Sequence, residues 1–278
     1  MLKQRVITAL ILGVLLLGAM FWLPELGWAA LVLAVVTLAA KEWGRLAKLS
    51  GIMLAAYVTI TSAALAGIIG YGLAGGKYAV WMQLSVYLPA ILFWLTVAPF
   101  WLWRGWHPRQ SVLALAGWLV LIPAGLAMND LRAESPLLLL FFLALVWMAD
   151  TAAYFAGKKF GRHKLAPSIS PGKTWEGAAG ALLGVSVYVA VVGWWGQHMR
   201  DYAEFLLAIP LSWVLVAISV EGDLFESAIK RQAGAKDSGA LLPGHGGMLD
   251  RIDALTSTLP LAGFVLVLSK TFADYGCG

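Results

Sequence analysis

Residues 137–157 read LLLLFFLALVWMADTAAYFAG, an apolar run in which Asp150 is the single charged residue. A helix needs about 20 predominantly apolar residues to cross the hydrocarbon core of a bilayer. Eight further runs have a comparable character: 6–23, 25–40, 54–73, 79–103, 111–128, 174–195, 203–221 and 254–272. The pattern therefore predicts an all-α integral membrane protein of about nine transmembrane helices.

The composition supports a membrane protein. Of the 278 residues, 60% are hydrophobic and 13% are charged, and the mean hydropathy is +0.79. Soluble domains carry about 45–50% apolar and about 25% charged residues, so this chain has too little polar surface for water. The net charge is +5, but the basic residues lie in short loops between apolar runs, which argues against a nucleic-acid partner. The single cysteine, Cys277, excludes an internal disulfide and a cysteine-based zinc site.

Lysine and arginine are distributed unevenly along the chain. With a cytoplasmic N-terminus and nine alternating spans, sixteen of them fall in cytoplasmic segments and four on the other side. Cytoplasmic loops are enriched in these residues, so we expect a non-cytoplasmic C-terminus. The chain then divides into residues 1–136, five scaffold spans, and residues 137–278, four spans with long cytoplasmic segments at 157–173 and 222–253. The short N-terminal extension indicates a bacterial inner (plasma) membrane.

The segment at 221–255, EGDLFESAIKRQAGAKDSGALLPGHGGMLDRIDAL, is dense in charge and glycine. If the preceding helix continues into it, four polar residues share one helical face: Asp223, Glu226, Ser227 and Lys230. Asp250 and Asp253 likewise share a face of the next helix. Crowded carboxylates without cysteine favour a hard divalent cation such as Mg²⁺, and the interleaved basic residues suit phosphates. A polar site for metal-assisted phosphoryl or nucleotidyl transfer is therefore expected among the C-terminal helices, facing the cytoplasm.

The spacing within this segment resembles a known signature. Ser227-x-Ile229-Lys230-Arg231-x4-Lys236-Asp237-x-Gly239-x2-Leu242-Pro243-x-His245-Gly246-Gly247-Met248-x-Asp250-Arg251-Ile252-Asp253 is similar to that of phosphatidate cytidylyltransferases. The stretch SPGKTWEG at 170–177 resembles the S-P-x-K-T-x-E-G segment of that family. Upstream, Asp150 and Tyr154 fall in a stretch that resembles its D-x3-Y-x2-G-x3-G pattern.

The resemblance implies transfer of CMP from CTP to phosphatidate, giving CDP-diacylglycerol and pyrophosphate. It implies that Asp223 and Asp250 hold Mg²⁺, with a monovalent cation such as K⁺ as a candidate companion. The residues expected to act in catalysis are Asp223, Asp250, Lys230, Lys236 and Lys173. Those expected to bind substrate or phosphate are Ser170, Lys173, Thr174, Ser227, Lys230, Arg231, Lys236, His245, Gly246, Gly247 and Arg251. Further candidates are Asp150, Tyr154, Glu226, Asp237 and Asp253. The expected partners are CTP, phosphatidate and membrane lipids, with a second copy of the chain as a candidate.

Some of these residues also have a structural interpretation. Thr174 and Glu176 suit the beginning of a helix, and Asp253 suits an ion pair with Arg251 or Lys230. The spacing Gly180-x3-Gly184 predicts close packing of two helices. The fourteen tryptophans are expected in interfacial belts and on lipid-facing surfaces.

Two other functions compete with the nucleotidyltransferase. A CTP-dependent lipid kinase of the polyprenol type would pass the γ-phosphoryl group to an alcohol and would release CDP instead of pyrophosphate. A transporter would place charges near the bilayer midplane and would show related halves. Here the charges gather at one surface, which disfavours transport.

Overall fold

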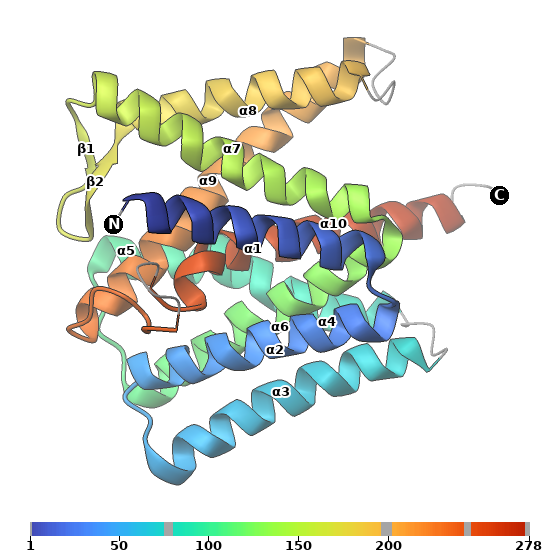
Figure 1. Cartoon of the computed structure of the whole chain (residues 1–278), viewed down its shortest axis with the longest axis vertical. Coiled ribbons are helices and arrows are strands. Elements are labelled where there is room, and N and C mark those ends of the chain that lie inside the picture. The colour runs from blue at the N-terminus through green and yellow to red at the C-terminus, as the bar shows by residue number, and fades with distance from the viewer. Residues whose placement is uncertain (1, 75–79, 196–201, 242–245, 276–278) are drawn as a thin grey trace.

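The chain folds into a bundle of long helices with one small β-hairpin (Figure 1). The computed structural model describes residues 2–74, 80–195, 202–241 and 246–275. The helices are α1 (Leu2–Trp22), α2 (Glu25–Leu46), α3 (Gly51–Leu73), α4 (Val80–Leu92), α5 (Ala98–Arg104), α6 (Gln110–Glu134), α7 (Pro136–Phe160), α8 (Trp175–Trp195), α9 (Tyr202–Gln232) and α10 (Leu249–Tyr275).

Eight helical segments in the described parts of the chain are long and apolar enough to cross a membrane. One of them, Val80–Arg104, runs through α4, a π-helical turn at Phe93–Val97 and α5. The α1 helix contributes a shorter apolar stretch, Ile11–Trp22. The all-α integral membrane fold is confirmed, and the number nine stays a prediction.

Several helix boundaries follow from local sequence. Ser135 precedes α7, and its Oγ accepts a hydrogen bond from the Leu137 backbone N–H at 3.2 Å. Pro136 occupies the first turn, where its missing N–H is no loss. At the end of α5, Gly105 takes the left-handed conformation with φ of 60°, which glycine adopts without a steric penalty.

The predicted cytoplasmic segment 157–173 is more ordered than a loop. The α7 helix extends to Phe160, and strands β1 (Lys164–Ala166) and β2 (Ser170–Thr174) pair antiparallel, with Ala166 opposite Ser170. The all-α prediction missed this hairpin because its strands are only three and five residues long, and no apolar alternation marks them. The hairpin leads directly into α8.

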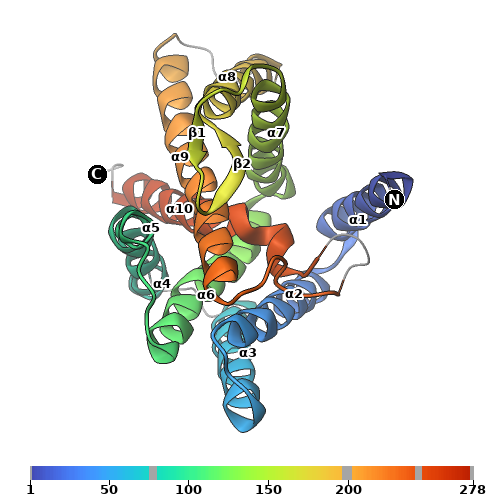
Figure 2. The ribbon, with the colours of Figure 1, turned by 90° about the vertical axis from the view of Figure 1, so that its left-hand side faces the viewer.

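Helix α10 lies at the centre of the bundle, packed against α4, α6 and α9 (Figure 2). A second, smaller apolar core joins α7, α8 and α9. Within it, a Cβ on Gly180 would lie 2.3 Å from Ala156 Cβ, and one on Gly184 would lie 2.6 Å from Ala152 Cβ. The close packing predicted for this glycine pair is therefore confirmed.

The tryptophans divide into two groups, so the expectation that they serve mainly as belts was wrong for some of them. Trp28, Trp43 and Trp101 are almost completely buried. Trp43 satisfies its Nε1–H by donating to the Leu113 carbonyl at 2.8 Å, which lets a polar ring edge sit in the core. Others, such as Trp195, are exposed as expected.

Candidate active site

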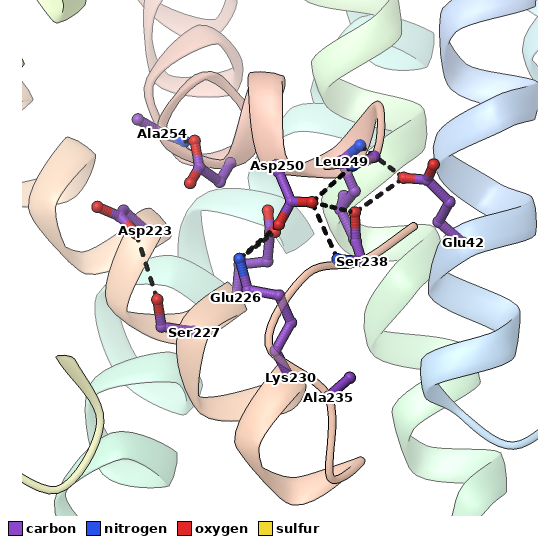
Figure 3. Close-up of polar contacts among 12 residues, drawn as sticks. Glu42, Asp223, Glu226, Ser227, Lys230, Ala235, Ser238, Leu249, Asp250 and Ala254 are labelled. Atoms are coloured by element: carbon purple, nitrogen blue, oxygen red, sulfur yellow. Dashed lines mark hydrogen bonds and ion pairs between the residues drawn. The ribbon is translucent and has the colours of Figure 1, made fainter. Parts of the chain in front are cut away.

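Helix α9 continues well past the predicted end of its span. Because it runs to Gln232, the predicted segment 222–253 narrows to the connection between α9 and α10, called here the 233–248 loop, of which the structure describes residues 233–241 and 246–248. The shared face of α9 is confirmed by its contacts: Ser227 Oγ donates to Asp223 Oδ1 at 3.4 Å, and Lys230 Nζ lies 3.0 Å from Glu226 Oε1 (Figure 3). The helical period thus gathers these four side chains.

An aromatic cluster fixes this part of α9. Phe225 is 1% exposed, and its ring packs edge-on against Trp101, Phe93 and Trp94 at centroid distances of 5.1, 5.4 and 5.5 Å. Its neighbours in sequence therefore have little freedom to rotate around the helix axis. A rigid aromatic contact thereby orients the polar face.

Helices α9 and α10 approach closely beside the carboxylates. A Cβ on Gly222 would lie 2.3 Å from Ser257 Oγ and 2.9 Å from the Asp253 carbonyl oxygen. A larger residue would therefore separate the two helices. Ser257 also donates to the Ile218 carbonyl at 2.8 Å, which links the helices again. This contact brings the polar faces of α9 and α10 together.

Lys230 joins the two faces. Its Nζ donates to Asp250 Oδ1 at 2.6 Å. The lysine side chain is 11% exposed, and those of Glu226 and Asp250 are 4% and 9% exposed. One buried ammonium thus serves two buried carboxylates. The hydrogen bond of this ammonium goes to Asp250. Glu226 is within ion-pair distance, but neither of its oxygens has a hydrogen-bond partner among the residues that the structure describes.

The other oxygen of Asp250 holds the loop that precedes α10. Asp250 Oδ2 accepts from the Ser238 backbone N–H at 2.9 Å, the Ser238 hydroxyl at 2.9 Å and the Gly247 N–H at 2.8 Å. Gly246 takes a left-handed conformation with φ of 79°, which turns the chain toward α10. Asp250 therefore organises the loop as well as pairing with Lys230.

The hairpin delivers a second lysine to the same region. Lys173, on β2, places its Nζ 2.7 Å from Asp223 Oδ2 and donates to the Val220 carbonyl at 3.1 Å. Both partners of the ion pair are partly exposed, at 22% and 32%. The two sequence segments singled out as motifs thus meet in space.

These carboxylates form one electrostatic unit, called here the acidic cluster: Asp150, Asp223, Glu226, Asp250 and Asp253. The charge of Asp253 is influenced by those of Asp223 and Asp150, and the charge of Glu226 by those of Asp253 and Asp250. Two ammonium groups pair with this cluster: that of Lys173 with Asp223, and that of Lys230 with Glu226 and Asp250.

Other predicted site residues lie around this cluster. Arg231, Lys236, Asp237 and Arg251 are exposed. Asp150 and Tyr154 are both exposed on α7, one turn apart, and Lys158 Nζ lies 5.7 Å from the centre of the tyrosine ring. His245, predicted to bind phosphate, lies outside the described residues.

Two predicted residues on the hairpin have different environments. Ser170 begins β2, opposite Ala166. Thr174 is buried, and its Oγ1 accepts a hydrogen bond from the Gly177 N–H at 3.1 Å. This is the helix-cap interpretation that the sequence left open. Glu176, also expected at the beginning of this helix, lies in its first turn, and its Oε1 is 2.6 Å from Nδ1 of His163.

Sequence reasoning missed Glu42, a buried acidic residue on α2. It is 6% exposed and accepts hydrogen bonds from three groups in and after the 233–248 loop. The sequence offers only a weak signal, an acidic residue beside Lys41 and Arg45 at the predicted cytoplasmic end of a span.

A cavity of about 270 Å³ lies far from these residues, at the other end of the bundle. Its wall includes Asp130, whose Oδ2 accepts from Tyr87 at 2.8 Å and from Gln83 at 3.2 Å. None of the predicted site residues lines it. The chemistry expected from the motifs belongs to the acidic cluster and not to this cavity.

Comparison with known proteins extends the resemblance over the whole chain. Residues 3–269 match the model of the cytidylyltransferase family. The chain is 40% identical over 276 residues to the phosphatidate cytidylyltransferase of Pseudomonas aeruginosa, covering 96% of this chain and 97% of that protein. It is 35% identical over 286 residues to that of Haemophilus influenzae, covering 95% and 98%, and 36% identical over 285 residues to that of Brucella suis, covering 98% and 95%. The N-terminal helices therefore share in the similarity.

Proposed function

Because the chain belongs to the cytidylyltransferase family, we propose that it transfers CMP from CTP to phosphatidate, giving CDP-diacylglycerol and pyrophosphate. It is an integral membrane enzyme of the nucleotidyltransferase class. The ion pair between Lys173 and Asp223 carries the proposal most directly, because it joins the two conspicuous motifs in one charged site.

In this reaction a phosphate oxygen of phosphatidate attacks the α-phosphorus of CTP. The bond from that phosphorus to the oxygen bridging to the β-phosphate breaks, and pyrophosphate leaves with the bonding electrons. A phosphomonoester is largely ionised near neutral pH, since its second pKa is about 6. No residue therefore has to remove a proton from the attacking oxygen. The chain must instead align the two phosphates and balance their charge.

We assign the charge balance to the basic residues around the acidic cluster. Lys173 and Lys230 already place their ammonium groups among the carboxylates. Arg231, Lys236 and Arg251 are exposed nearby, on α9, α10 and the loop between them. An anionic triphosphate entering this region would exchange its water contacts for these cations, which are suited to phosphate oxygens. Phosphatidate would supply a second anionic group for the same cations.

The acidic cluster fits a divalent cation by its donor chemistry. The groups that could hold the ion would all be carboxylate oxygens, and the two Glu226 oxygens have no hydrogen-bond partner within the described chain beside the ion pair with Lys230. We propose that Asp223 and Asp250 hold Mg²⁺, with Glu226 and Asp253 close by. No three Asp, Glu, His or Cys side chains in the described ranges converge on an ion by themselves, so water and phosphate oxygens would complete the shell, as they commonly do for Mg²⁺. The bound ion would neutralise negative charge on the nucleotide. A companion ion such as K⁺ rests on the resemblance alone.

The proposal includes an orientation. The ends of α2, α7 and α9 and the beginnings of α8 and α10 lie at the end of the bundle that holds the acidic cluster (Figure 1). We propose that this end faces the cytoplasm of a bacterium, across its inner membrane, because CTP is water-soluble and the similar proteins are bacterial. The N-terminus would then be cytoplasmic and the C-terminus non-cytoplasmic. A homodimer stays a prediction that crosslinking in native membranes would test.

A labelling experiment tests the reaction. Purified protein in detergent is given Mg²⁺, phosphatidate and CTP labelled at either the α- or the γ-phosphate. The expected result is α-label in the lipid and γ-label in pyrophosphate. Entry of γ-label into a lipid alcohol would support the kinase alternative and overturn the proposal, as would the absence of any transfer by folded protein.

A further inference from the structure

Glu42 makes a contact that joins the two halves of the chain. It lies near the end of α2, whereas its partners belong to the loop before α10 and to the first residues of that helix (Figure 3). Its Oε1 accepts from the Met248 N–H at 3.0 Å, and its Oε2 accepts from the Leu249 N–H at 2.8 Å. Oε2 also accepts from the Ser238 hydroxyl at 2.9 Å. A buried carboxylate of the N-terminal region therefore receives its hydrogen bonds from the C-terminal region.

Two of these hydrogen bonds come from backbone N–H groups at the beginning of α10. The first N–H groups of a helix have no partner within the helix and carry partial positive charge. Glu42 satisfies two such groups from a neighbouring helix. It is held firmly itself, because the adjacent Trp43 is 1% exposed and bonded to α6 through the Leu113 carbonyl. The start of α10 is thus attached to a rigid part of the bundle.

The loop is shaped to admit this carboxylate. A Cβ on Gly247 would lie 2.4 Å from Glu42 Oε2, and one on Gly239 would lie 2.5 Å from its Oε1. Two glycines therefore let the backbone reach the carboxylate at a distance that a side chain would prevent. Ser238, which directly precedes Gly239 and is 7% exposed, places its hydroxyl 2.9 Å from both Glu42 Oε2 and Asp250 Oδ2. A hydroxyl has one proton, so the two carboxylates share it.

We propose that Glu42 is a positioning residue for the nucleotide: it clamps Ser238 and the beginning of α10 at Met248 and Leu249, and thereby sets Asp250 for the reaction. The proposal rests on the proposed function. The loop exposes the charged side chains of Lys236 and Asp237 to water, whereas the acyl chains of phosphatidate must stay in the bilayer. Loss of the clamp therefore weakens the use of CTP more than the use of phosphatidate.

Hydrogen–deuterium exchange tests the clamp without reference to activity. In Glu42→Gln, one acceptor oxygen becomes an N–H₂ donor that faces other donors. The Met248 and Leu249 amides should exchange about tenfold faster or more, the change expected for loss of a charge-assisted hydrogen bond. Exchange within α3 should not change. Equal exchange of these two amides in the variant and the wild type would overturn the clamp.

Steady-state kinetics test the positioning role. In Glu42→Gln the KM for CTP should rise about tenfold, while the KM for phosphatidate changes by less than about twofold. A purely structural role would lower kcat through the folded fraction and leave both KM values unchanged, and that result would overturn the proposal. Glu42→Asp keeps both acceptor oxygens and should recover part of the CTP affinity. Glu25→Gln, an exposed position in the first turn of the same helix, is the matched control and should behave as wild type.

The two tests separate this inference from the proposed function. If wild-type protein transferred nothing from CTP to phosphatidate, the proposed function would fail, and the exchange rates would still decide whether Glu42 holds the loop. If wild type is active and Glu42→Gln keeps a normal KM for CTP, the positioning role fails alone.

Discussion

The ammonium group of Lys230 lies 2.6 Å from Asp250 Oδ1 and 3.0 Å from Glu226 Oε1. It therefore occupies the space between two buried carboxylates on different helices. A metal ion held by Asp250 would compete with this ammonium group for the carboxylate. Lys230 thus balances the charge of the acidic cluster in the structure described here, and a phosphate entering the cluster would offer it another partner.

Replacing Lys230 with methionine should reduce both stability and turnover. The substitution keeps an unbranched chain of nearly the same length but leaves Glu226 and Asp250 without their cation. Removal of one partner from a buried ion pair destabilises a protein by about 3–5 kcal/mol. Chemical unfolding in mixed micelles, followed by circular dichroism, would measure the change in the free energy of unfolding.

Lys270→Met is the control for that experiment. Lys270, on α10, pairs with Glu134, but its side chain is 56% exposed. Such a pair contributes about 0–1 kcal/mol, so this variant should unfold like wild type. Equal unfolding free energies for Lys230→Met and wild type would contradict the buried role of Lys230.

Asp223→Asn and Asp250→Asn should each reduce turnover by about 100-fold or more, because both carboxylates are proposed to bind the metal and to face the phosphates. Their effects on stability should differ. Asp250 accepts four hydrogen bonds, so an amide nitrogen at this position would face at least one donor. Asp223 pairs with Lys173, and both side chains are partly exposed. We therefore expect Asp223→Asn to lower the free energy of unfolding only slightly. Activity assays and unfolding curves on the same preparations would separate the two effects, and near-normal turnover in either variant would refute the metal assignment.

Much of this arrangement could be predicted from the sequence. The apolar runs located the helices because the bilayer demands a minimum apolar length, and the helical period predicted the shared face of Asp223 and Lys230 correctly. The meeting of Lys173 with Asp223 was anticipated only through the family resemblance, because no local pattern links a hairpin to a helix so distant in sequence.

Glu42 shows where such reasoning stops. Its partners Ser238 and Leu249 lie 196 and 207 residues further along the chain. In the sequence it resembles an ordinary charge at the cytoplasmic end of a span. Only the packing of α2 against the start of α10 brings its carboxylate to the groups from which it accepts hydrogen bonds. The buried tryptophans were missed for a related reason, since composition cannot tell a ring that faces lipid from one that faces another helix.

Removal of divalent cations should abolish turnover. The carboxyl groups of the acidic cluster are the proposed holders of Mg²⁺, and that ion would neutralise negative charge on the triphosphate of CTP. Addition of EDTA to active protein should stop CMP transfer, and excess Mg²⁺ should restore it. Far-UV circular dichroism should not change, because the helices are held by packing between apolar side chains. Full activity in EDTA would show that the chain's own cations suffice.

Gly247→Ala should impair the enzyme by steric means. The added methyl carbon would lie 2.3 Å from Ser238 Oγ and 2.4 Å from Glu42 Oε2, so the loop would have to move away from α2. Overpacking of this kind destabilises a protein by about 1–3 kcal/mol, and the displaced loop should raise the KM for CTP as Glu42→Gln does. Gly70→Ala in α3 is the control, since its methyl group would meet nothing within 4 Å and alanine favours a helix over glycine by about 1 kcal/mol. If Gly247→Ala and Gly70→Ala had the same KM for CTP and the same free energy of unfolding, the close contact between the loop and Glu42 would not contribute to function.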